Sequence, residues 1–195
     1  MSLVILAVLI LGILAGMGMP VEISGWIDQA SSYLLLILLV SVGIDMGRNR
    51  EVFLRIRELG MRILLIPFGV VAGSLCGGMV AALLLRMPLR EGMAITAGLG
   101  WYSLSGILMT EAGNPMGGAL SFLSNVFREV LTFLLVPVLA GQGGFYAAIA
   151  PAGATAMDTT LGLISKHTNG TVAVIAFVSG VVCTLAVPFL VPLFC

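Results

Sequence analysis

Long runs of apolar residues, separated by short polar turns, follow one another along almost the whole chain. A transmembrane helix needs about 20 consecutive, mostly apolar residues to cross about 30 Å of hydrocarbon. The apolar runs predict about seven such helices, at residues 2–19, 31–46, 63–85, 92–109, 119–140, 147–165 and 171–194. The predicted fold is therefore an all-α polytopic membrane protein.

Two of the predicted spans contain interruptions. The segments "TAGLGWYSLSG" (residues 96–106) and "APAGATAMDTT" (residues 150–160) place glycine or proline beside hydroxyl groups at mid-span. Backbone freed from a helix at membrane depth is tolerated only inside protein or beside a water-filled cavity. A pair of discontinuous helices indicates a transporter's binding site, since half-helix ends and loose carbonyls can hold charged groups. A simple packing kink in each segment is the alternative.

The composition agrees with a membrane protein. Hydrophobic residues make up 59% of the chain and charged residues 9%, with a mean hydropathy of +1.16, whereas soluble domains are about 25% charged. Little sequence is left for a soluble domain, so we expect one transmembrane transporter domain over residues 1–195, surrounded by the lipid bilayer. The net charge is zero and no basic run is paired with aromatic residues, so we expect no nucleic-acid partner.

The cysteines predict neither disulfides nor a metal site. Cys76, Cys183 and Cys195 lie in or at the end of apolar runs, without CxxC spacing, and His167 is the only histidine. Zinc sites require closely spaced Cys and His ligands. We therefore expect no metal, no cofactor and no disulfide.

The basic segment "RNREVFLRIRELGMR" (residues 48–62) sets the orientation of the chain. It holds five of the arginines, and cytoplasmic loops are rich in Lys and Arg, so this loop is predicted to be cytoplasmic. Arg86 and Arg90 mildly oppose this orientation, because it places their loop on the outer side of the membrane. The segment is either a solvated loop or a short helix on the inner leaflet, since its apolar positions have helical spacing.

Small residues recur at a spacing of four in two predicted spans, at Gly12 and Gly16 and again at Gly69, Gly73 and Gly77. Such spacing lets helix backbones approach closely in a membrane. We expect these glycines to pack against neighbouring helices or against a partner.

The fifth predicted span carries two adjacent charges, Arg128 and Glu129, at its middle. Each costs about 2.5 to 3.5 kcal/mol at the centre of a membrane helix, so such residues face the bundle interior or a cavity. Their side chains project about 100° apart, which makes a mutual ion pair unfavourable. Arg128 instead belongs to a polar stripe of helical spacing that comprises Ser121, Asn125, Arg128 and Thr132.

Asp158, in the second interrupted segment, is the predicted partner of Arg128, which leaves Glu129 available. A lone carboxylate in a cavity of low dielectric can exchange a proton or bind a cationic substrate. The alternative is a buried network of Arg128, Asp158 and Glu129 that only fixes the register of the helices.

Several segments resemble a known family. They are residues 98–140 ("GLGWYSLSGILMTEAGNPMGGALSFLSNVFREVLTFLLVPVLA"), "PAGATAMDTTLGLISKHTN", the closing "VAVIAFVSGVVCTLAVPFLVPLF" and "LLVSVGIDMGRNRE". These segments are similar to the C-terminal two thirds of the LysO-type bacterial lysine exporters. The resemblance covers nearly the whole chain. It implies export of L-lysine and toxic lysine analogues across the bacterial inner membrane, in exchange for protons that enter.

The resemblance also implies site residues. Glu129 is the intramembrane acid of the family and the expected proton-coupling and ammonium-binding group. The motif "GWYSLSG", the first signature, contributes Trp101, Tyr102, Ser103 and Ser105. The motif "GATAMDTT", the second signature, contributes Thr155, Asp158 and Thr159. With Asn125 these residues form the predicted substrate-binding set, in which the unwound segments hold the α-carboxylate and Glu129 or Asp158 meets an ammonium group.

Longer members of the family have further spans at the N-terminus that look like the other half of an inverted repeat. We expect a short membrane partner, a second copy of the chain or a reduced form of the transporter to account for them.

Three other functions remain open at this stage. The substrate of the transporter could be another amino acid or an organic ion, although the acids Glu129, Asp158, Glu111 and Asp45 favour a cationic substrate such as lysine. A purely structural membrane subunit is the second alternative. An intramembrane serine protease built on Ser105 is the third, but it needs a base beside the serine, and His167 lies in a polar turn.

Overall fold

The computed structural model describes residues 60–195 and scattered helical positions between residues 11 and 44. The chain divides into two compact units, residues 1–44 and 45–195, and the fold described below belongs to the second. The predictions for the first two spans and for the basic segment 48–62 lie largely outside the described residues. The count of seven spans and the single domain over residues 1–195 therefore stay predictions.

Three helices of the described region are long and apolar enough to cross a membrane: α4 (Leu65–Leu85), α7 (Pro115–Gly141) and α9 (Gly170–Phe194). A short 3₁₀ helix, η1 (Met61–Leu64), precedes α4. The three long helices match the spans predicted at 63–85, 119–140 and 171–194. Helix α7 begins earlier than predicted because Pro115 starts its first turn and the side chain of Asn114 accepts a hydrogen bond from Gly117 N, a combination typical of helix starts.

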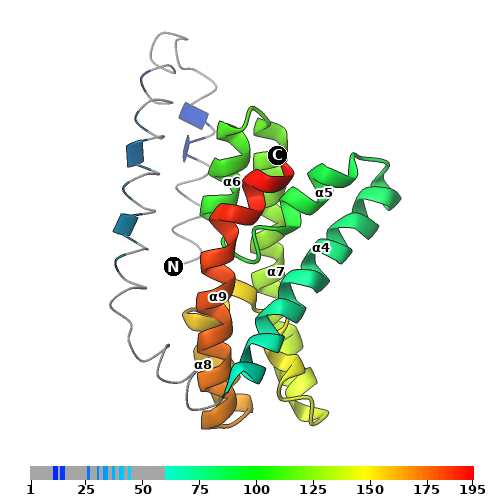
Figure 1. The fold of residues 1–195 in the computed structure, drawn as a ribbon, viewed down its shortest axis with the longest axis vertical. Helices are drawn as coiled ribbons and strands as arrows, with labels where there is room; N and C mark the ends of the chain where they lie inside the picture. Colours follow the sequence, from blue (N-terminus) through cyan, green and yellow to red (C-terminus); the bar gives the residue numbers. More distant parts are fainter. Residues whose placement is uncertain are drawn as a thin grey trace. The chain divides into compact units, whose positions relative to one another are not determined.

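The region between α4 and α7 is a helical hairpin, which we call the first hairpin (residues 89–111). It consists of α5 (Leu89–Thr96) and α6 (Tyr102–Glu111), joined by a turn at residues 97–101. Near its open end the Asn114 amide donates to Glu91 Oε1 at 3.0 Å, so the first turn of α5 and the end of α6 lie close together in space. Figure 1 shows both ends of this hairpin at one end of the unit, with the turn near the middle.

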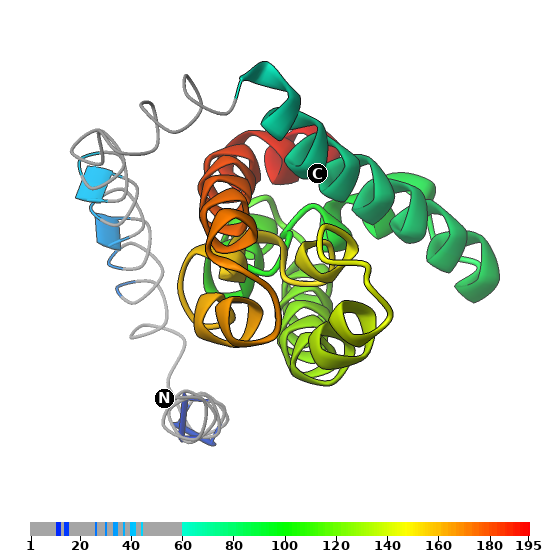
Figure 2. The ribbon, with the colours of Figure 1, turned by 90° about the horizontal axis from the view of Figure 1, so that it is seen from below.

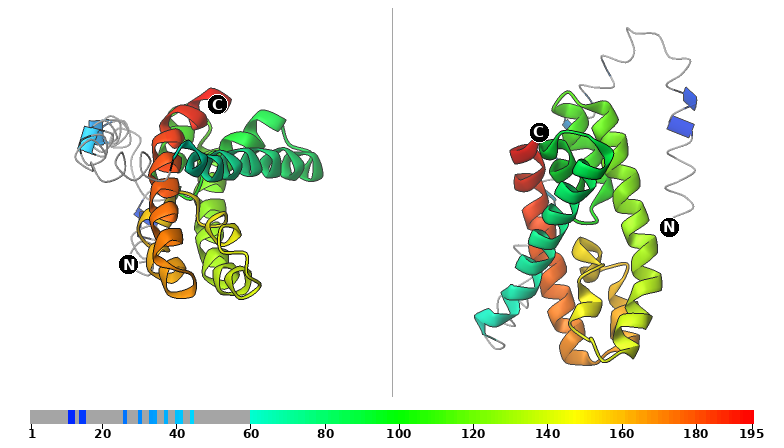
Figure 3. Two further views of the ribbon diagram at one scale, coloured as in Figure 1. Left: turned by 60° about the horizontal axis from the view of Figure 1, so that its bottom comes forward. Right: turned by 90° about the vertical axis from the view of Figure 1, so that its right-hand side faces the viewer.

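The region between α7 and α9 forms the second hairpin (residues 147–167). It contains two 3₁₀ helices, η2 (Ala147–Ile149) and η3 (Gly153–Met157), followed by α8 (Leu161–His167). Ile149 and Ile164 lie in one buried cluster with Ala140 near the end of α7 and Val172 near the start of α9. The second hairpin therefore enters from the end of the unit opposite to the first, as the right-hand view of Figure 3 shows.

Helix α9 is the most buried of the three long helices: 56% of its most apolar stretch is buried, against 17% for α4 and for α7. It packs along the second hairpin at Gly180, where an added Cβ would lie 2.7 Å from Met157 Cβ. Figure 2 shows α9 beside the second hairpin and α4 at the outside of the unit. Burial at this contact fixes the second hairpin against the core.

Helix α4 crosses α5 through a close contact of two glycines. A Cβ built at Gly78 would lie 2.5 Å from Gly92 O, and one built at Gly92 would lie 2.6 Å from Gly78 O. The predicted packing of Gly69, Gly73 and Gly77 is not formed within the described residues, because a Cβ at each would meet nothing within 4 Å. Packing of these three glycines against a partner stays a prediction.

Candidate functional site

The tips of the two hairpins contact each other through backbone. Ala154 N donates to Leu99 O at 2.8 Å, which joins the turn of the first hairpin to η3 of the second. Leu99 and Gly153 both have positive φ, of 49° and 59°, and an added Cβ at Gly153 would collide with Leu99 O. Glycine is therefore required at residue 153 by conformation and by space.

Asn125 of α7 holds the unwound turn of the first hairpin. Its Oδ1 accepts from Gly100 N at 2.7 Å, and its Nδ2 donates to Ile95 O and Ser121 O at 3.2 and 2.8 Å. Ser121 Oγ also donates to Ile95 O, at 3.1 Å. Ser121 and Asn125 of the predicted polar stripe thus bind backbone groups that have no helical partner where α5 ends, as buried polar groups require.

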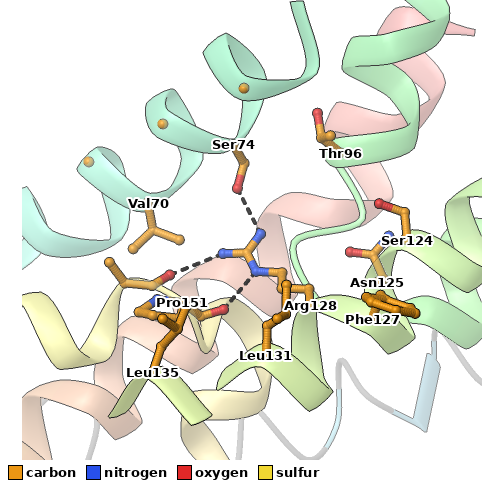
Figure 4. A pocket seen from close by; sticks show the side chains of 14 residues that line it. Val70, Ser74, Thr96, Ser124, Asn125, Phe127, Arg128, Leu131, Leu135 and Pro151 are labelled. Atoms are coloured by element: carbon orange, nitrogen blue, oxygen red, sulfur yellow. Dashed lines mark hydrogen bonds between the residues drawn. The ribbon is translucent and has the colours of Figure 1, made fainter. Parts of the chain in front are cut away.

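Arg128, one turn further along α7, holds the second hairpin. Its Nε donates to Pro151 O at 2.8 Å, its Nη2 to Ala150 O at 3.1 Å and its Nη1 to Ser74 Oγ of α4 at 2.7 Å. Figure 4 shows these three contacts. No ion pair with Asp158 occurs among the described residues, so the Arg128–Asp158 pairing stays a prediction.

Glu129 is buried in α7, with 9% of its surface exposed. Within the described part of the chain its carboxylate forms no hydrogen bond and no ion pair. The phenol of Tyr102 in α6 lies close enough to interact electrostatically with both Glu129 and Asp158. Two of the predicted site residues, Glu129 and Asp158, are therefore in the electrostatic surroundings of a third, Tyr102.

The remaining residues of the first signature differ in burial. Ser105 is buried and donates to Tyr102 O at 3.3 Å, and its described contacts include no base. Gly98 lies between Ser105 and Asn125, since its Cβ would contact both side chains. Trp101 is half-buried at the start of α6, and Ser103 is exposed.

The second signature forms a compact turn between η3 and α8. Thr155 Oγ1 donates to Ala152 O at 2.9 Å and lies 3.3 Å from Thr160 Oγ1. Thr160 Oγ1 in turn donates to Thr155 O at 2.9 Å. Asp158 and Thr159 are exposed at the end of this turn, where Asp158 Oδ1 accepts from Thr159 N. The buried threonines support the turn that presents Asp158.

A pocket of about 560 Å³ lies between α4 and α7 on the Arg128 side of the stripe (Figure 4). Its walls come from the glycine face of α4, from Thr96 of α5, from α7 and from residues 150 and 151. Sequence reasoning missed Ser74 as a site residue, although it is a lone hydroxyl within the glycine ladder. It also missed the carbonyls of residues 150 and 151, which nothing but the tertiary structure reveals.

The described residues contain no group of three His, Cys, Asp or Glu side chains that could hold a metal ion. His167 Nδ1 lies 3.0 Å from Leu163 O at the end of α8, and Cys76, Cys183 and Cys195 are free thiols.

The apolar helices define a multi-pass helical membrane protein. The family model described as "Lysine exporter LysO" matches residues 6–195, so the chain belongs to the lysine exporter LysO family, as the resemblance predicted.

Two relatives show how much of the chain is shared. It is 36% identical over 166 residues to the lysine exporter LysO of Escherichia coli (strain K12), covering 85% of this chain and 55% of the relative. It is 36% identical over 167 residues to a putative lysine exporter of Haemophilus influenzae, covering 86% of this chain and 85% of that relative. The chain thus spans about half the length of the Escherichia coli protein. No solved structure matches it.

Proposed function

We propose that the chain exports L-lysine and lysine analogues across the bacterial inner membrane as a secondary transporter, in exchange for protons. The observation that carries the proposal is Glu129, a residue only 9% exposed whose carboxylate has no partner in the described region, next in the chain to Arg128, which holds the second hairpin. Membership of an exporter family supports transport over an enzyme or a purely structural subunit.

The two hairpins are the proposed discontinuous membrane segments. Each presents backbone groups to side chains near the middle of α7, and irregular backbone at membrane depth is tolerated only where protein or a water-filled cavity receives it. Asn125 and Arg128 receive these groups from one helix. Such tips are the usual place for substrate binding in transporters with interrupted helices.

Glu129 has the proposed role of coupling acid. An ionised carboxylate binds an ammonium group of lysine, whereas a protonated one does not attract it. Because Glu129 holds either a proton or an ammonium group, proton entry and lysine exit become two halves of one cycle. Asp158 and Tyr102, which interact electrostatically with each other, would supply the second polar contact that a dibasic substrate requires.

The proposed substrate-binding set is that of the sequence analysis: Trp101, Tyr102, Ser103, Ser105, Asn125, Glu129, Thr155, Asp158 and Thr159. In the proposed orientation the segment 48–62 is cytoplasmic, by its arginine content. A short membrane partner or a second copy of the chain would supply the spans that the Escherichia coli relative has in addition.

The test is lysine transport by the reconstituted protein, together with any short membrane protein encoded beside it. Proteoliposomes with an imposed pH gradient should accumulate labelled L-lysine, and Glu129→Gln should abolish the gradient-driven accumulation. The matched control is Glu91→Gln, since a glutamine oxygen still accepts from Asn114. Absence of lysine flux in the wild type, or normal accumulation by Glu129→Gln, would refute the proposal.

A further inference from the structure

The pocket between α4 and α7 has the chemistry of an anion site. Arg128 is the one charged side chain that lines it, and no acid is among the described lining residues. The hydrogen bonds of Arg128 go to two carbonyls and one hydroxyl, all of them neutral. Arg128 is half-buried, and a cation partly withdrawn from water without a counter-charge is costly, so the pocket favours an anionic group.

Unused hydrogen-bond donors face the same space. A guanidinium has five N–H groups, and the contacts of Arg128 occupy Nε and one position on each of Nη1 and Nη2. One N–H on each terminal nitrogen therefore stays available. Ser74 accepts from Arg128, which leaves its own O–H free to donate, and the Ser124 hydroxyl makes no hydrogen bond within the described region (Figure 4).

The rest of the pocket suits an aliphatic chain. Val70, Phe127, Leu131 and Leu135 form apolar walls around the polar end, next to the bare backbone of the α4 glycines. A carboxylate on a short hydrocarbon chain matches this combination of donors and walls.

The depth of Arg128 distinguishes a substrate from a lipid headgroup. Arg128 is the middle residue of α7, which has 27 residues, so it lies about 20 Å from either end of the helix. Lipid phosphates lie outside a hydrocarbon core of about 30 Å. A phosphate held at the interface does not reach this depth.

We infer that Arg128, with Ser74 and Ser124, binds the α-carboxylate of the transported amino acid, and so makes the transporter select amino acids over amines. The inference rests on the proposed function and deepens it. Arg128 and Glu129 would then divide the work: the cation binds the carboxylate, while the acid on the neighbouring face binds an ammonium group. This assigns the adjacent charges to two ends of a zwitterion.

The test compares binding of L-lysine with that of L-lysinamide, in which a neutral amide replaces the carboxylate. In nanodiscs containing the full chain, the wild type should bind L-lysine about ten- to a hundredfold more tightly than the amide, as expected for charge-assisted hydrogen bonds. Ser124→Ala and Arg128→Lys should both weaken lysine binding and leave amide binding unchanged, so the preference shrinks.

Ser124→Ala keeps the test decisive if Arg128→Lys fails to fold, because the Ser124 hydroxyl makes no hydrogen bond to another described residue. Ser165→Ala, at an exposed position of α8, is the matched control and should keep the full preference. Equal affinity of the wild type for both ligands, or equal weakening of both by the two variants, would overturn the inference. If Glu129→Gln still abolishes pH-driven lysine transport in that case, the proposed function stands without it. If the wild type binds neither ligand, both fail.

Discussion

At the scale of single residues, Asn125 has a structural use that its place in the polar stripe did not reveal. Both N–H groups of its amide donate to carbonyls and its oxygen accepts from Gly100 N. Gly100 N lies in an unwound turn and has no helical acceptor, so Asn125 replaces the partner that a continuous helix would provide.

Asn125→Ala should therefore destabilise the protein. Its loss leaves Gly100 N buried without an acceptor, at a cost of about 1 to 3 kcal/mol. Thermal unfolding in detergent should show a lower Tm than the wild type. Gln142→Ala, at an exposed position just after α7, should leave the Tm unchanged, and identical Tm values for the two variants would contradict this role.

The polar stripe itself was predictable from sequence, but its partners were not. The spacing of Ser121, Asn125 and Arg128 places them on one helix face, which the structure confirms by their contacts with the two hairpins. Sequence reasoning assigned Arg128 to a carboxylate because charge was the visible signal. In the structure two of its three acceptors are carbonyls, which every residue carries and which therefore give no signal in the sequence, and the third is the Ser74 hydroxyl.

At the scale of elements, length and hydropathy predicted the three long helices to within a few residues. The hairpins were harder, because α5, α6 and α8 are each too short to cross a membrane. Their apolar character still suggested spans at 92–109 and 147–165, where the structure has the short helices of the two hairpins. That these hairpins are interrupted membrane spans stays a prediction, and the contact between the tips depends on tertiary hydrogen bonds that the sequence does not reveal.

Helix α9 holds the second hairpin through Gly180, so Gly180→Ala should loosen it. The added methyl group would collide with the backbone of Met157 and approach its Cβ, and overpacking of this kind typically costs about 1 to 3 kcal/mol. Gly170→Ala, at the open start of the same helix, should be neutral or slightly stabilising. Thermal unfolding measures both, and equal Tm values would show that the contact yields without cost.

At the scale of the whole described region, the two hairpins open toward opposite ends. Arg90 and Ala112 lie near the open end of the first, and Gln142 and Lys166 near that of the second. If the hairpins enter the membrane without crossing it, each of these pairs shares one side. Helices that cross fully would instead separate Arg90 from Ala112.

Labelling single cysteines with a membrane-impermeant maleimide measures this, in a background where the three native cysteines are alanine. Cysteines at positions 90 and 112 should react from one side of the membrane, and those at 142 and 166 from the other. Reaction of positions 90 and 112 from opposite sides would rule out a re-entrant first hairpin.

Because one turn of α7 holds both tips, the two sides of the described region are mechanically linked. Asn125 binds the first tip, Arg128 binds the second, and the tips bind each other at Leu99 and Ala154. Withdrawing one tip removes contacts that also restrain the other, so the free energy of opening toward one side depends on the state of the opposite side. In the proposed transporter, a leak with both tips open together would require all three attachments to break at once.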